Sequence, residues 1–138
     1  MIKKLLLTTF MLIGIIEIGL SFDRNEIIVQ DTIYSFTDVD KPPVPKKGME
    51  KLYIKWNSVA NYPMEARQNG VEGKVYISFI VNTKGKISET GVLKGIGSGC
   101  DEATLEAFKI TKLKWRPGIK DEQKVKVKMI LPFTFKLN

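Results

Sequence analysis

The chain has 138 residues, a length that predicts a single domain. It contains no histidine and one cysteine, Cys100, which excludes a structural zinc site, a disulfide within the chain and a histidine-dependent catalytic triad. The formal net charge of +7 admits a nucleic-acid or anionic membrane partner, but we favour a solvated lysine-rich surface.

The N-terminus has the pattern of a targeting segment. Lys3 and Lys4 precede a nearly continuous apolar run, Leu5 to Ile16, and small residues follow at Gly19 and Ser21. The run is shorter than the roughly 20 residues that span a bilayer. Residues 1–21 are therefore predicted to be a signal peptide cleaved after Ser21, with an uncleaved membrane anchor as the alternative. Either places the remaining chain outside the cytoplasm, so no nucleic-acid partner is expected.

Residues 22–48 are interpreted as a linker with a proline-rich end. Apolar residues such as Ile33 and Phe36 leave open a strand or packing on the domain surface. The segment KPPVPKK, 41–47, favours an extended path because its prolines fix φ. We interpret it as a boundary before the domain rather than as a ligand for a proline-binding groove.

The domain is predicted to occupy residues 49–138. Apolar residues at helical spacing predict a first helix from Met49 to Trp56. A second helix, Pro63 to Gln68, is expected to end at Asn69-Gly70.

Two strands joined by a turn come next. The first turns Val75, Ile77, Phe79 and Val81 to one face. A turn at 82–85 leads to a second strand over 86–95, with a bulge near Thr90-Gly91.

A third helix is predicted after the glycine-rich segment 95–99, with Ser98 as its N-cap. Phosphate binding is not expected at these glycines, since the lysine of a P-loop is missing. Cys100 is interpreted as a small buried residue of this helix. Trp115 is expected to pack at the rim of the core.

The final strand has the clearest pattern in the chain. Apolar residues alternate with mostly polar ones from Lys124 to Leu137, and Phe133 and Phe135 are expected to be buried with Phe79. Pro132 has no N–H for a ladder, which predicts a sheet edge there. The lysines fit protection of an edge by charge, and an edge can also accept an extended peptide.

These motifs, in this order, resemble the C-terminal domain of the energy transducer TonB, in the style of short TonB-like proteins of Bacteroidetes. The resemblance rests on YPMEARQNGVEGKVYISFIVNTKGKI, GVLKGIGSGCDEATLEAF, KWRPG and VKVKMILPFTFKL, and it covers about Asn61 to Leu137. It implies an α+β fold of two helices packed on a three-stranded antiparallel sheet.

The resemblance also implies a function in the periplasm. No catalysis, cofactor or metal is expected, because the chain has no histidine, no carboxylate pair at helical spacing beside a nucleophile and no set of metal ligands. The domain would bind the TonB-box peptide of an outer-membrane TonB-dependent receptor by strand addition and support energised transport. The implied partner-binding residues are Asn61, Tyr62, Pro63, Lys124, Val125, Lys126, Val127, Lys128, Met129 and Ile130.

Other partners are left open. The apolar N-terminal segment has no histidine, which favours receptor binding over coupling to inner-membrane motor proteins. A homodimer is compatible with the sequence. The alternative function is that of an envelope scaffold or adaptor that is not coupled to transport.

Overall fold

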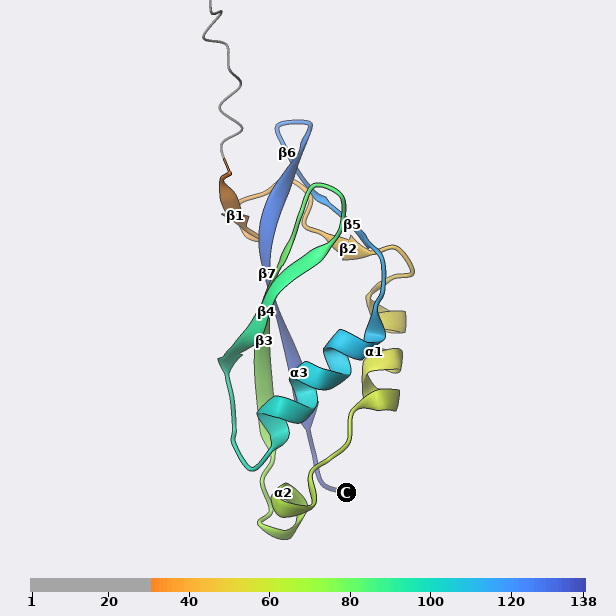
Figure 1. Cartoon of the computed structure of the whole chain (residues 1–138), viewed down its shortest axis with the longest axis vertical. Coiled ribbons are helices and arrows are strands. Elements are labelled where there is room, and N and C mark those ends of the chain that lie inside the picture. Colours follow the sequence, from red (N-terminus) through yellow and green to blue (C-terminus); the bar gives the residue numbers. More distant parts are fainter. Residues whose placement is uncertain (1–30) are drawn as a thin grey trace, which may run out of the picture. The chain divides into compact units, whose positions relative to one another are not determined.

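The computed structural model describes residues 31–138, which form one compact unit. Its elements are β1 (Ile33–Ser35), β2 (Val44–Pro45), α1 (Met49–Val59), α2 (Met64–Gln68), β3 (Gly73–Val81), β4 (Ile87–Lys94), α3 (Cys100–Thr111), β5 (Trp115–Arg116), β6 (Gly118–Lys120) and β7 (Gln123–Phe135) (Figure 1). The predicted signal segment 1–21 lies outside the described residues.

The main sheet is built on the three antiparallel strands that the sequence predicts. Its order is β1-β7-β3-β4, and β6 forms a hairpin with the start of β7. Strands β3 and β7 pair over nine positions, from Gly73 with Phe135 to Val81 with Val127. The register between β3 and β4 shifts twice, between Tyr76 and Ile77 and between Ser78 and Ile80. The second shift falls at Glu89, which adopts φ 50°, and Thr90, which confirms the bulge predicted near Thr90-Gly91.

The chain before the first helix is part of this fold. β1 joins the sheet in parallel to β7, and β2 pairs with β5. Pro43 is fully buried, and Phe36 and Val39 pack against the core. The apolar residues between 31 and 48 therefore contribute to the domain, and a segment interpreted from composition as a linker supplies two of its strands.

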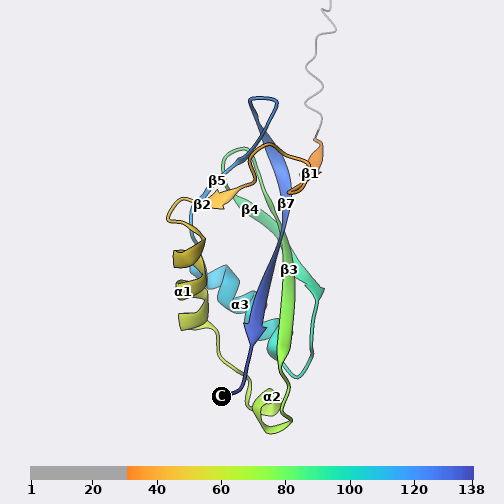
Figure 2. The ribbon, with the colours of Figure 1, turned by 180° about the vertical axis from the view of Figure 1, so that it is seen from behind.

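Helices α1 and α3 pack on one face of the sheet, and Figure 2 shows β3 and β7 from the opposite side with no helix in front of them. Trp56 of α1 is fully buried, with its ring centroid 4.8 Å from that of Phe133 and 5.1 Å from that of Phe108. Its indole N–H donates to the carbonyl of Thr104, 3.1 Å away, which satisfies a polar group inside the core. A third, short helix, α2, closes one end of the sheet, so the observed domain has three helices, one more than the resemblance implies.

The α+β class and the buried face of the sheet are confirmed. Phe79 is fully buried, and Phe133 and Phe135 are nearly so. The prediction for Trp115 was wrong: this residue is 1% exposed, and its ring lies 5.2 Å from that of Phe79. The turn at Gly85 explains the difference, because its tight approach to the backbone of Trp115 draws the connector onto the core.

The predicted N-cap of α3 was also wrong. Gly99, at φ 80°, occupies the cap position, and no side chain caps the helix. Ser98 adopts φ 57° in the preceding loop. Asp101 instead accepts a hydrogen bond from the amide of Ile96 at 2.8 Å, so its carboxylate holds the loop rather than the first turn.

Candidate partner-binding edge

Strand β7 has two edges with different neighbours. One edge is paired with β3 over Val127 to Phe135. The other is paired with β1 over Lys126 to Lys128 only. Beyond Lys128, no strand within residues 31–138 lies on the β1 side, so this edge is covered along a short part of its length.

The direction of the backbone groups defines which residues serve this edge. The amide of Phe36 donates to the carbonyl of Lys128 at 3.2 Å, so Lys128 directs its backbone toward β1. Backbone groups alternate between the two sides of a strand, and therefore Lys126 and Ile130 face the same edge. Val127 and Met129 direct theirs toward β3.

Pro132 limits the edge at the other end. The backbone nitrogen of Pro132 faces the same side as that of Ile130, away from β3. Because this nitrogen carries no hydrogen, its position there means that no hydrogen bond to β3 is lost. Its carbonyl accepts a hydrogen bond from the hydroxyl of Tyr53, 3.2 Å away. Burial raises the pKa of Tyr53 above its ordinary value of 10.0, so this phenol remains a donor to more alkaline pH than a free tyrosine. An added strand therefore has Lys126, Lys128 and Ile130 as its available ladder positions.

The side chains of the predicted stretch Lys124 to Ile130 fall into two groups. Val127 is fully buried and Met129 is 7% exposed, so these residues offer a partner only their backbone. Val125 is partly buried against the same core.

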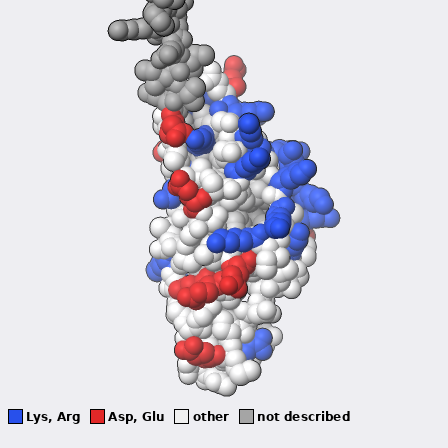
Figure 3. Space-filling view, viewed as in Figure 1, with Lys and Arg blue, Asp and Glu red and all other residues white. Residues whose placement is uncertain are grey.

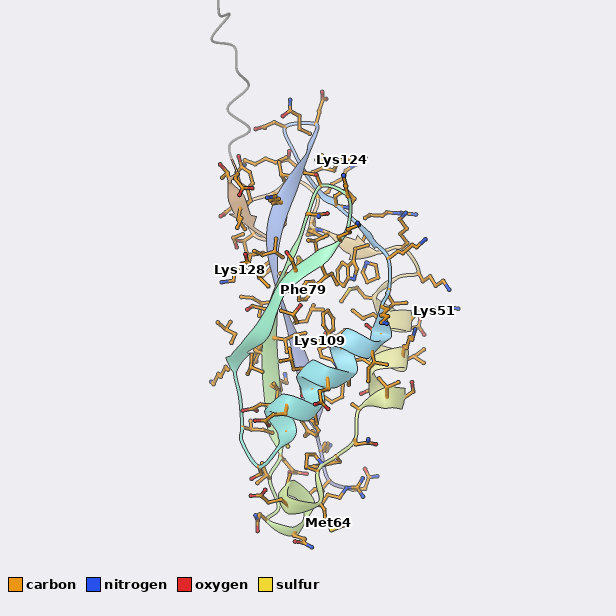
Figure 4. All side chains as sticks on the ribbon, in the orientation of Figure 1. Lys51, Met64, Phe79, Lys109, Lys124 and Lys128 are labelled. Atoms are coloured by element: carbon orange, nitrogen blue, oxygen red, sulfur yellow. The ribbon has the colours of Figure 1, made fainter. Side chains whose placement is uncertain are left out.

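The three lysines of this stretch do not form one surface. Lys124 lines a hollow beside Arg116, and Lys128 lines a different hollow beside β1. In Figure 4 their labelled side chains point to different sides of the strand. Lys126 forms an ion pair with Asp31, just before β1.

The hollow beside β1 has a volume of about 430 Å³. Its lining includes Ile33 and Tyr34 of β1, Ile80 of β3, Glu89 of β4 and Lys128. It combines one carboxylate, one ammonium and apolar walls. A strand at this edge would place alternate side chains toward such a space, which is how strand-addition sites obtain specificity.

Asn61, Tyr62 and Pro63 lie at the other end of β7. The ring of Tyr62 packs edge-on against Phe135 at 5.1 Å, and its hydroxyl donates to the carbonyl of Val71. Pro63 is the N-cap of α2, one position before its predicted place inside that helix. The structure thus does not bring these three residues together with Lys124 to Ile130, and Tyr62 is engaged in holding α2 to the sheet.

Burial raises the pKa of Tyr62, with smaller contributions from Glu72 and Cys100. Burial also raises the pKa of the Cys100 thiol, and Asp101 and Glu102 add to the effect. The thiol is fully buried and stays protonated, which suits the packing role predicted for it. Residues 31–138 contain no cluster of side chains that could hold a metal ion.

Sequence reasoning left open a strand near Ile33 without pairing it with β7, and it missed the contact of Tyr53. The sequence feature that indicated β1 was the apolar pair Ile33-Tyr34 within the segment interpreted as a linker. Because β1 has only three residues, it shows no clear alternation of apolar and polar side chains. Tyr53 lies within the segment predicted as the first helix, but its hydroxyl contact spans 79 residues of sequence, which helical spacing does not encode.

The family model for the C-terminal domain of the Gram-negative bacterial TonB protein matches residues 58–137. The chain belongs to this family. The domain is therefore a protein-binding module of TonB-type energy transduction, within a transport-related family that is not an enzyme family.

Solved structures of TonB C-terminal domains are similar to part of the chain. The chain is 27% identical to the Helicobacter pylori TonB C-terminal domain, which has two solution structures, and the TM-score is 0.46 for both. Each match covers 65% of this chain; it covers 82% of the longer Helicobacter pylori chain and 96% of the shorter one. It is 24% identical to the Pseudomonas aeruginosa TonB C-terminal domain, covering 56% of this chain and 78% of that one, with a TM-score of 0.38. No curated protein sequence matches the chain. No helix in the described part is long and apolar enough to cross a bilayer.

Proposed function

We propose that this TonB-family domain works in the periplasm and binds outer-membrane TonB-dependent receptors by accepting their TonB-box segment as an added strand on β7. The proposed ladder runs along the β1 edge between Lys124 and Ile130. Family membership supports the receptor as partner. The observation that carries the proposal is that this edge already pairs with an extended segment, β1.

The proposal requires β1 to give way, because its three residues occupy Lys126 to Lys128. The strand is held lightly. Ile33 is 45% exposed, and the ion pair of Lys126 with Asp31 lies at the surface, where such pairs contribute about 0–1 kcal/mol. A receptor segment that takes the place of β1 and extends to Ile130 gains a ladder position that β1 does not use.

A proline substitution tests the ladder. Lys128→Pro removes an N–H on the β1 edge, whereas Val127→Pro removes one that faces β3 and is expected to damage the fold. Thr134→Pro is the matched control, because Thr134 faces the same edge beyond Pro132. Binding of a labelled TonB-box peptide is measured by fluorescence anisotropy, with circular dichroism as the check on folding.

The proposal expects Lys128→Pro to weaken binding at least tenfold while Thr134→Pro leaves it unchanged. Equal binding by both folded variants would contradict strand addition here. Failure of the unmodified protein to bind any TonB-box peptide would favour the scaffold function instead.

Asn61, Tyr62 and Pro63 are proposed to assist only by holding the far end of β7. Tyr62→Phe removes the hydroxyl contact to Val71 and keeps the ring on Phe135. It is expected to lower stability and to leave peptide affinity unchanged.

A further inference from the structure

A broad basic face lies away from the β1 edge. In Figure 1 β1 is at the left, while β2, β5 and α1 are at the right, and Figure 3 shows Lys and Arg side chains gathered over that right-hand side. Three hollows lie in this region, and no Asp or Glu among residues 31–138 lines any of them. We refer to the surface of these three hollows as the basic face.

The first hollow, of about 580 Å³, is lined by cations from four separate segments of the chain: Lys41, Lys46, Lys84, Arg116 and Lys124. Four of these five are lysines. A lysine is a compact charge on a flexible stem, without the planar fork with which arginine recognises one carboxylate or phosphate.

The second and third hollows continue the first one. The amide of Lys46 donates to the carbonyl of Lys114 at 2.8 Å, which joins β2 to the end of the α3 connector. Lys114 lines the second hollow with three other lysines, from the β3–β4 turn and the end of α3. Leu113 lines both the second and the third hollow, and the third adds Lys47, Lys51 and Lys55 at α1.

Exposed aliphatic side chains stand among these cations. Val44 is 38% exposed in the first hollow, and Ile54 is 61% exposed in the third, between Lys51 and Lys55. Exposed aliphatic residues within a cluster of lysines are typical of surfaces that lie on anionic bilayers, where the aliphatic groups enter the interface and the ammonium groups meet the headgroups.

We propose that the basic face docks on an anionic phospholipid surface. The charges are spread over several elements and do not converge on one point, which fits a planar polyanion better than a single acidic peptide. Apart from Lys124, the residues of the proposed receptor ladder lie outside the three hollows, so one molecule can contact lipid and a receptor segment together. The proposal does not depend on the strand-addition function.

The test uses the full chain and vesicles of phosphatidylcholine with or without phosphatidylglycerol, separated by flotation. The ratio of binding to anionic and neutral vesicles is the measured quantity, so any apolar anchoring that is common to both cancels. The test variant is Lys47→Gln with Lys51→Gln and Lys55→Gln. The matched control is Lys74→Gln with Lys94→Gln and Lys136→Gln, which has the same net charge but changes exposed lysines outside the three hollows.

Each basic residue near an anionic surface contributes about fivefold, so the test variant is expected to lower the ratio on the order of a hundredfold. The control is expected to change it only a few-fold, and about 0.5 M salt should abolish the preference. Equal losses in the two variants would overturn the proposal, as would a ratio near unity for the unmodified protein. Binding of a poly-glutamate peptide at the basic face without any vesicle preference would identify an acidic-protein site and also overturn it.

Discussion

Phe79 is the side chain whose removal tests the core most sharply. It is fully buried, and its ring lies 4.8 Å from that of Phe108 and 5.2 Å from that of Trp115. It therefore joins β3 to α3 and to β5. Phe79→Ala removes a whole ring from a site whose aromatic neighbours belong to two other elements, α3 and β5, which limits how far they can collapse into the space.

Such a truncation is expected to cost about 3–5 kcal/mol. Small domains are stable by only about 5–15 kcal/mol, so the variant should lose a large part of its stability. Urea unfolding followed by tryptophan fluorescence measures the difference, since Trp56 and Trp115 are both buried in the native state.

Leu93→Ala is the control, because Leu93 is 54% exposed on β4. It should cost less than about 1 kcal/mol. If Phe79→Ala cost as little as this control, the assignment of the strand faces would be wrong, because a shift of one residue in register would exchange the buried and exposed sides.

Further predictions concern the edge, the turn and the N-terminus. Tyr53→Phe deletes the hydrogen bond to Pro132 and should lower stability by about 0.5–1.5 kcal/mol in thermal or urea melts. The pKa of Tyr53 is higher in the folded protein than in the unfolded chain, so the contribution of this group to the free energy of unfolding is complete below its ordinary pKa of 10.0. That contribution is lost as the pH rises through the folded pKa. In melts at alkaline pH, Tyr53→Phe should therefore lose less stability than the unmodified protein. Gly85→Ala should destabilise by more than about 1–2 kcal/mol, because φ is +76° and a Cβ would collide with the carbonyl of Trp115, whereas Gly91→Ala, with open space around it, is the milder control. N-terminal sequencing of the exported protein should find Phe22 first; an intact Met1 in the membrane fraction would show an anchor instead.

The sequence was sufficient for those parts of the fold that have a clear period. The alternation of β7 identified the buried side of every residue from Val127 to Phe135, because a strand with one face on the core must repeat every two residues. The first helix was predicted from Met49 to Trp56 for the same kind of reason, because Leu52 and Trp56 lie one turn apart on the buried side; the observed helix continues to Val59.

The remaining parts depend on contacts between distant segments, which no local pattern encodes. β1 has three residues and β2 has two. Such short strands form only because β1 can pair with the edge of β7 and β2 with the edge of β5. The burial of Trp115 depends on the turn at Gly85, thirty residues earlier in the chain.

The site was predictable in part. Pro132 correctly indicated the edge, since its imide nitrogen faces away from β3. The occupation of that edge by β1, and the distance of Tyr62 from it, required the fold.

The measurement that bears most directly on the central proposal is a titration of the isotope-labelled protein with an unlabelled TonB-box peptide, followed by amide chemical shifts and hydrogen exchange. Strand addition predicts shifts and new protection at Lys126, Lys128 and Ile130, together with loss of protection in Ile33 to Ser35 as β1 is released. Shifts confined to Lys41 to Trp56, with Lys124 to Ile130 unaffected, would contradict it and would make the proline-rich segment the binding site.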